Sequence, residues 1–227
     1  MLRRKNIFFV SIFFVLVTQY APTGLAKEKP LPTACITQCK TPYGEVLGIG
    51  IGNVRAYSNC SAACVVNAPN IINGTFTGIK WQCVEYARRW LLRNKGVVYG
   101  DVDVAADIWN LNFVTRVKDK TRFKLSTYAN GNKTQPRVGD LLIYAKAYLK
   151  TGHVAVVSSV NSKAQTVQVI EENYNNTKWP GDYARSIHYV KQDKKFWLLD
   201  SYLLGWKHVT NQTLNSIDKY DGSSPVH

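Results

Sequence analysis

Long apolar runs are absent from the body of this 227-residue chain. Since a membrane-spanning helix needs about 20 consecutive apolar residues, we expect no stable membrane span in the mature protein. Internal repeats and low-complexity tracts are also missing, which argues against a repeat protein and against extended disorder. Hydrophobic residues make up 45% of the sequence and charged residues 19%, a composition typical of a globular domain.

A short apolar run does occur at the very start of the chain. Basic residues at positions 3–5 precede residues 7–17, which are apolar except for Ser11. This run is too short to span a bilayer, and a cleavage site with small residues follows it at positions 24 and 26. We therefore predict a signal peptide over residues 1–26 and a secreted or periplasmic protein. An uncleaved N-terminal anchor is the alternative.

Acidic residues are scarce, with 15 Asp and Glu against 29 Lys and Arg. Residues 1–26 hold three of the basic residues and none of the acidic ones, so the mature chain would keep a net charge of about +11. Such a charge could attract an anionic partner such as a cell-wall polymer, although it also serves solubility. The basic residues are scattered rather than grouped, and no nucleic-acid partner is expected.

The five cysteines fall into two pairs and one single residue. Cys35 and Cys39 have C-x3-C spacing, as do Cys60 and Cys64, and Cys83 stands apart. In an oxidising compartment the pairs predict two disulfides, and the odd cysteine is a candidate reactive thiol. Three connectivities are possible. We favour bridges between the two pairs, with a four-thiolate zinc site as the weaker alternative. No metal and no cofactor is otherwise predicted.

Apolar periodicity predicts an α+β fold in which helices come first and antiparallel strands second. An amphipathic helix should run from Cys83 to about Leu92 and end at Gly96, with a second helix over residues 104–112. Residues 58–80 have the composition of a loop. The predicted strands are two short ones around the turn at Gly52-Asn53, and then 141–144, 154–160, 166–171, 186–190, 196–201 and 203–209.

Cys83 is placed where a thiolate would be stabilised, at the start of the predicted helix. A helix N-terminus and a nearby imidazolium both lower the pKa of a thiol. The Cys83 N–H and the Gln82 side chain are candidate donors to an oxyanion. His153 follows Gly152 and opens an apolar strand, so it could project into a cleft. The alternatives are a buried structural cysteine and a surface histidine.

A third polar group could orient the imidazole. Glu171, Glu172 and Asn173 end the strand that should pair with the His153 strand. A carboxylate or amide there would hold the tautomer and stabilise the imidazolium. The alternative for each is a solvated strand end. Cysteine, histidine and then an acid or amide in chain order is a recurrent arrangement for acyl transfer.

The segment Lys80-Trp81-Gln82-Cys83-Val84-Glu85-Tyr86-Ala87-Arg88-Arg89-Trp90-Leu91 resembles the nucleophile helix of CHAP-domain amidases (cysteine, histidine-dependent amidohydrolases/peptidases). The similarity is greatest to the amidase domains joined to glutathionylspermidine and trypanothione synthetases. It continues at Thr151-Gly152-His153-Val154-Ala155 and at Glu171-Glu172-Asn173, and covers about residues 43–208. The predicted signal peptide and the paired cysteines are departures from the family pattern.

The resemblance implies a papain-like CHAP domain over residues 43–208, with the nucleophile helix packed on an antiparallel sheet. Residues 27–42 would be a lead-in segment and residues 209–227 a polar C-terminal tail. Within the domain the resemblance implies six site residues: Cys83 as nucleophile, His153 as base, Glu171 as orienting carboxylate, Gln82 in the oxyanion hole, and Arg88 and Asn173 near the substrate.

Three functions are compatible with these residues. The first is an exported amidase that acts on a small peptide–polyamine conjugate such as glutathionylspermidine. The second is a hydrolase of peptidoglycan peptides, which export, disulfides and positive charge favour. The third is a non-catalytic binding module on a CHAP scaffold, which would be expected to lack one of the catalytic residue types.

Overall fold

A computed structural model of the chain describes residues 30–214. The predicted signal peptide lies outside the described residues, as does the end of the predicted tail beyond residue 214. Within residues 30–214 the longest helix has 13 residues, which is too short to cross a bilayer.

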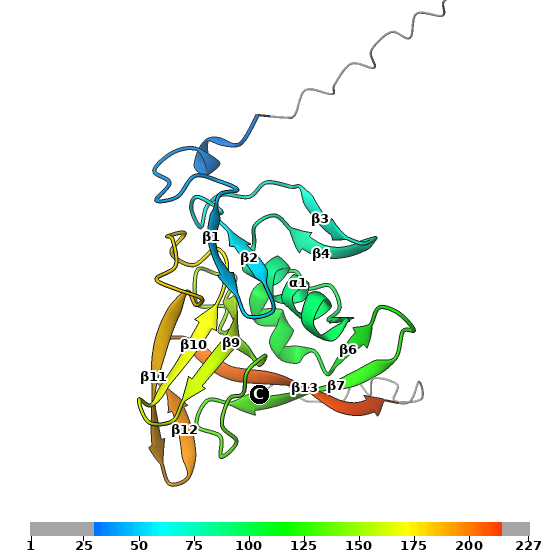
Figure 1. The fold of residues 1–227 in the computed structure, drawn as a ribbon, viewed down its shortest axis with the longest axis vertical. Helices are drawn as coiled ribbons and strands as arrows, with labels where there is room; N and C mark the ends of the chain where they lie inside the picture. The colour runs from blue at the N-terminus through cyan, green and yellow to red at the C-terminus, as the bar shows by residue number, and fades with distance from the viewer. Residues whose placement is uncertain (1–29, 215–227) are drawn as a thin grey trace, which may run out of the picture. The chain divides into compact units, whose positions relative to one another are not determined.

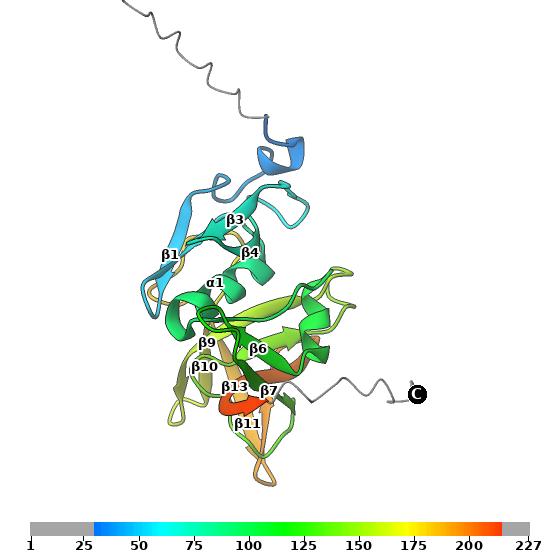
Figure 2. The same cartoon turned by 90° about the vertical axis from the view of Figure 1, so that its right-hand side faces the viewer.

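An antiparallel sheet of nine strands forms the larger part of the fold (Figures 1 and 2). Neighbouring strands pair antiparallel throughout, which confirms the predicted α+β class with a mostly antiparallel sheet. In spatial order the strands are β12 (Lys195–Leu198), β11 (Arg185–Gln192), β10 (Thr166–Ile170), β9 (His153–Asn161), β8 (Leu141–Tyr144), β13 (Leu203–Leu214), β7 (Arg122–Ala129), β6 (Phe113–Arg116) and β5 (Val97–Val98).

Helix α1 (Cys83–Lys95) lies between this sheet and two hairpins (Figure 1). The hairpins are β1–β2 (Val46–Gly50 and Val54–Tyr57) and β3–β4 (Pro69–Ile72 and Thr75–Ile79). As predicted, α1 ends at Gly96, which adopts the left-handed conformation (φ 65°) that glycine tolerates and donates its N–H to the Leu92 carbonyl.

The predicted amphipathic character of α1 is wrong in one respect. Strands and hairpins enclose the helix, so its charged residues Glu85, Arg88 and Arg89 are buried with the apolar ones. Buried charges persist where they are paired and hydrogen-bonded. Arg89 meets this condition through Glu85, one turn earlier, at 2.8 Å.

Several other elements differ from the prediction. The helix expected over 104–112 is a 3-10 helix, η2 (Ala105–Asn110), and a short 3-10 helix, η1 (Thr33–Cys35), lies near the N-terminal end of the described residues. The segment 58–80 contains the β3–β4 hairpin, whose turn at Asn73-Gly74 has positive φ at both residues, a common hairpin signal. Strand β13 extends to Leu214, past the domain end predicted at residue 208.

Two disulfides join the two cysteine pairs. Cys35 is bonded to Cys64 and Cys39 to Cys60, and Cys83 is free. The favoured connectivity between pairs is confirmed, and the zinc alternative is excluded because these thiols are bonded to one another. The bridges tie the segment around η1 to the loop that follows β2.

A buried charge cluster lies on the side of α1 that faces β2. The Arg89 guanidinium contacts Glu85 at 2.8 Å and Glu172 at 2.7 Å, and the Tyr57 N–H donates to the same Glu172 oxygen, Oε1. The second Glu172 oxygen is buried and has no hydrogen-bond partner. Burial, together with the charge of Glu85, raises the pKa of Glu172 well above its ordinary value, although Arg89 opposes this shift.

This cluster predicts a pH dependence of stability. Between the ordinary carboxyl pKa and the raised folded-state pKa, the folded protein holds a proton that the unfolded chain releases, so the Glu172 contribution to stability falls as pH rises. The slope is about 1.4 kcal/mol per pH unit for one proton. We expect Glu172→Gln to gain stability relative to wild type as pH rises through this window, measured by urea unfolding. Parallel pH profiles for the two proteins would contradict the assignment.

The disulfides predict a stability difference that depends on redox conditions. Cys39→Ser combined with Cys60→Ser should lower the free energy of unfolding by roughly 3 kcal/mol, because the open chain gains conformational entropy. Urea unfolding of wild type and the double variant, with and without a dithiol reductant, measures this effect. The difference should vanish in the reductant. Equal stability under oxidising conditions would contradict the bridge.

Candidate active site

Cys83 is the first residue of α1 and is buried. The N–H groups of the first helical turn have no acceptor within the helix, so they point their partial positive charge toward this end. The His153 imidazole lies close enough to Cys83 to lower the pKa of the thiol, and the backbone of Val84 and Val154 acts in the same direction. The thiol therefore lies in a setting that stabilises negative charge, as predicted for the helix start.

His153 opens strand β9 and is almost fully buried. Gly152 precedes it with φ 70°, and a Cβ there would stand 2.5 Å from the Tyr144 carbonyl oxygen, so only glycine allows this close entry into the strand. His153 Nε2 lies 2.8 Å from Glu171 Oε2. Since this contact occupies Nε2, Nδ1 is the ring nitrogen left to meet Cys83. Glu171 directly follows β10, which pairs antiparallel with β9.

The three groups shift one another's protonation. Burial raises the pKa of the Cys83 thiol, but the charge and hydrogen bond of His153 and the backbone of Val154 and Val84 outweigh it, so the net pKa is lowered. Burial lowers the pKa of His153, but Cys83 and Glu171 raise it to about 9. Burial raises the pKa of Glu171, whereas His153 and Arg185 lower it overall. These opposite shifts favour the ion pair of a Cys83 thiolate and a His153 imidazolium beside an ionised Glu171.

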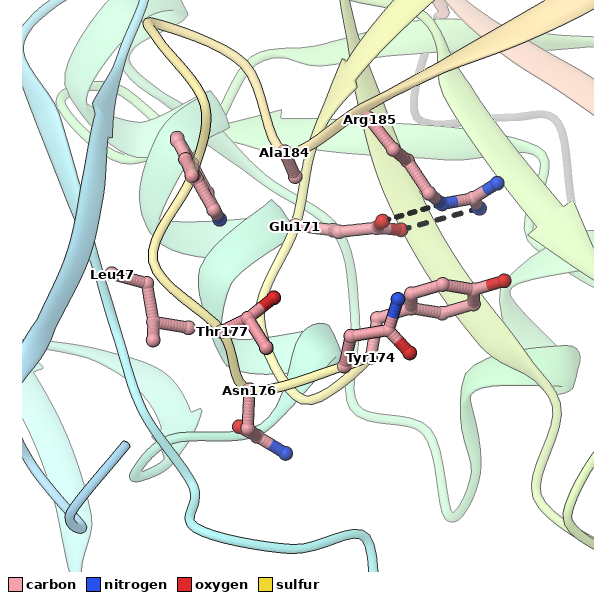
Figure 3. Close-up of a pocket in the computed structure, with 9 residues that line it drawn as sticks. Leu47, Glu171, Tyr174, Asn176, Thr177, Ala184 and Arg185 are labelled. Atoms are coloured by element: carbon pink, nitrogen blue, oxygen red, sulfur yellow. Dashed lines mark hydrogen bonds and ion pairs between the residues drawn. The ribbon is translucent and has the colours of Figure 1, made fainter. Parts of the chain in front are cut away.

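Arg185 is a site residue that the sequence did not reveal. It donates from Nε to Glu171 Oε1 at 2.7 Å (Figure 3), whereas His153 contacts the other oxygen, Oε2. Arg185 begins strand β11, which pairs with β10. The sequence predicted a strand only over 186–190, which leaves Arg185 out, and the pairing with β10 that brings Arg185 to Glu171 is not a local signal.

Gln82 and Asn173 lie together and connect the site to a disulfide. Asn173 Nδ2 donates to Gln82 Oε1 at 2.8 Å, and Gln82 Nε2 donates to the Cys64 carbonyl at 3.1 Å, with a weaker contact to Asn59 Oδ1 at 3.4 Å. The Gln82 amide nitrogen is thus engaged by the loop after β2. The Cys83 N–H, in the first turn of α1, is the other candidate oxyanion donor.

Arg88 is buried on the next turn of α1. It contacts Asp101 at 3.2 Å and the Gly100 carbonyl at 2.8 Å, and its guanidinium lies 4.8 Å from the Tyr99 ring centroid. Its Nε is buried without a partner. Arg88 also lines the cavity described next.

A cavity of about 410 Å³ opens beside Cys83 and His153. Most of its exposed lining is apolar, and a few polar groups converge on it, as in small-molecule sites. Among residues 30–214, no group of three or more His, Cys, Asp or Glu side chains is placed to hold a metal ion. The lining includes the apolar residues Val65, Phe76 and Leu149 and the charged residues Arg88, Asp101 and Asp103.

Comparison with known proteins gives these residues a family. Residues 74–173 match the CHAP domain family, and two relatives align over most of the chain. Residues 74–173 form a CHAP domain. The resemblance inferred from the cysteine helix is thereby confirmed. Cys83, His153, Glu171 and Asn173 all lie inside the CHAP domain, whereas Arg185 lies beyond its matched end.

The relatives are longer than this chain, and their names describe either a synthetase or a combined synthetase and amidase. Bifunctional glutathionylspermidine synthetase/amidase from Escherichia coli (strain K12) is 31% identical over 196 residues, which cover 80% of this chain and 31% of the relative. Trypanothione synthetase from Crithidia fasciculata is 30% identical over 177 residues, covering 78% of this chain and 27% of the relative. The chain therefore spans less than a third of the length of these relatives.

The lowered pKa of Cys83 predicts a titration that depends on His153. The alkylation rate of Cys83 by iodoacetamide should rise through a pH midpoint below the ordinary thiol value. In His153→Gln this midpoint should move upward, because burial then acts without the imidazolium. The exposed His188→Gln is the matched control and should titrate like wild type. An unchanged midpoint in His153→Gln would contradict the pair.

Proposed function

We propose that this chain is an exported thiol amidohydrolase that cleaves an amide bond through a thioester on Cys83, like the amidase activity named for its E. coli relative. The observation that carries the proposal is the placement of Cys83 and His153 together at the cavity, with His153 hydrogen-bonded to Glu171. A thiolate next to an imidazolium is the form that attacks carbonyl carbon.

In the proposed acylation step the Cys83 sulfur bonds to the substrate carbonyl carbon, and the carbonyl oxygen takes the negative charge. The Cys83 N–H stabilises this oxyanion from the helix end. Gln82 can add a second donor if its amide exchanges the Cys64 carbonyl for the oxyanion. As the C–N bond breaks, His153 gives its Nδ1 proton to the leaving amine.

In the proposed hydrolysis step His153, now neutral, takes a proton from water. The resulting hydroxide attacks the thioester carbonyl, the C–S bond breaks and the acid leaves. Cys83 returns as a thiolate beside a protonated His153. Glu171 accepts a hydrogen bond from Nε2–H throughout, which keeps Nδ1 directed at the reacting atoms.

The cavity supports a small conjugate with a carboxylate and a cationic amine. Its charged lining is one arginine and two aspartates, although the whole chain is strongly basic. Arg88 would meet a carboxylate on the acyl side. Asp103 lies on the segment that packs against Thr151, next to His153, and could face the leaving amine. These features favour a peptide–polyamine conjugate as substrate.

Export is supported by the disulfides, which form and persist in oxidising compartments. The same feature favours a second candidate, hydrolysis of peptidoglycan peptides outside the cytoplasm. Both candidates use the same residues and the same thioester chemistry. They differ in the substrate that fills the cavity.

Substrate incubation separates the two candidates. We expect the purified protein to release spermidine from glutathionylspermidine and to release no muropeptides from peptidoglycan. Cys83→Ala should lose this activity. The control variant, Cys39→Ser with Cys60→Ser, removes two disulfide-bonded cysteines and should keep the activity under conditions in which it is folded. Muropeptide release without spermidine release would favour the cell-wall candidate. Retention of activity in Cys83→Ala would contradict the nucleophile assignment.

A further inference from the structure

Arg185 does not line the cavity in which we place the substrate, yet it donates a hydrogen bond to the Glu171 carboxylate that orients His153. We propose that Arg185 is a positioning residue, which fixes Glu171 as a hydrogen-bond acceptor and thereby selects the His153 tautomer that can take the Cys83 proton. This inference rests on the proposed thiol chemistry and extends it beyond the residues of the matched CHAP range, which ends at residue 173.

The contact between Arg185 and Glu171 is nearly bidentate. Nε donates to Oε1 at 2.7 Å, and Nη2 lies 3.5 Å from Oε2, the oxygen that also accepts from His153 (Figure 3). A planar guanidinium that meets a carboxylate with two nitrogens restricts its rotation. Arg185 on β11 therefore fixes the orientation of the Glu171 carboxylate, and His153 contacts the carboxylate in that orientation.

Arg185 is itself held from three directions. Its Nη1 donates to Asp200 Oδ2 at 2.6 Å and its Nη2 to the Tyr144 hydroxyl at 2.9 Å, while the Tyr144 hydroxyl donates to Asp200 at 2.7 Å. The Tyr174 ring covers the guanidinium with its centroid 4.1 Å away. Because the Arg185 side chain cannot change rotamer without breaking several contacts, its position relative to Glu171 is fixed.

The positive charge decides whether Glu171 accepts or donates. A buried carboxyl group without a cation favours its neutral form, which carries an O–H. A neutral Glu171 could donate to His153 Nε2, and the imidazole proton would then sit on Nδ1, facing Cys83. That tautomer cannot accept the thiol proton. With Arg185 present Glu171 stays ionised and accepts from Nε2–H, which leaves Nδ1 for Cys83.

Arg185 also lies apart from the cavity in which we place the substrate. It lines a separate small cavity behind Glu171 with Tyr174 and Trp179 (Figure 3), and is not among the residues that line the larger cavity. Its loss should therefore lower kcat and leave KM nearly unchanged. The titratable or charged groups near the His153–Glu171 pair are Cys83, Tyr86, Tyr144, Tyr148, Tyr174, Arg185 and Asp200.

The test combines Arg185→Met with Arg185→Lys. In Arg185→Met the pH midpoint of Cys83 alkylation should move upward, and kcat should fall by roughly 100-fold, within the ~100- to 10,000-fold that a general base contributes. Arg185→Lys keeps the charge but not the planar fork, so it should recover only part of kcat. Lys191→Met, an exposed change on the same strand, is the control and should match wild type.

The outcomes separate this inference from the proposed function. Alkylation needs no amide substrate, so a raised midpoint in Arg185→Met supports the positioning role even if no amide is hydrolysed. An unchanged midpoint with unchanged kcat overturns it, while amide hydrolysis by wild type would still stand. Full recovery of kcat in Arg185→Lys would overturn the part of the inference that rests on the planar guanidinium, because the positive charge alone would then suffice. If Arg185→Met does not fold, the alkylation midpoint and kcat are measured in Arg185→Lys and Asp200→Asn. Both variants keep a positive charge at position 185.

Discussion

The electrostatic interaction between Cys83 and His153 is the one on which the site depends, because it joins two elements that the chain builds separately. Cys83 gains its setting from the start of α1, where free N–H groups favour a thiolate. His153 gains its own from the start of β9, where Gly152 lets the backbone pass close to the end of β8. Packing of α1 on the sheet is what brings the thiolate and the imidazolium together in a buried place, where each stabilises the charge of the other.

A row of polar groups continues from this contact along one end of the sheet. Tyr144 ends β8, His153 opens β9, Glu171 follows β10, Arg185 opens β11 and Asp200 follows β12. Since neighbouring strands are antiparallel, the end of one lies beside the start of the next, and the five side chains come together. From His153 to Asp200 the charges alternate, so each ion has a partner of opposite sign. The sheet order thus supplies electrostatic support that no single segment contains.

Sequence patterns predicted the parts of the site that depend on local signals. The helix from Cys83 to Gly96, the β9–β10 hairpin and the separation of Cys83 from the paired cysteines each follow from spacing within a short segment. The β3–β4 hairpin was missed although its Asn73-Gly74 turn is a local signal, because residues 58–80 as a whole have a loop-like composition. Arg185 and the burial of Glu85 and Arg89 could not be predicted, because they depend on strand pairing and packing across long stretches of chain.

The central claim is that Cys83 carries the acyl group during catalysis. The most direct measurement is intact-protein mass spectrometry after rapid acid quenching of a reaction with glutathionylspermidine. If Cys83 is acylated, the protein should gain a mass equal to the glutathionyl acyl group. Peptide mapping should locate this mass on Cys83, and it should be absent from Cys83→Ala. Spermidine release without any adduct on Cys83, or an equal adduct in Cys83→Ala, would contradict it.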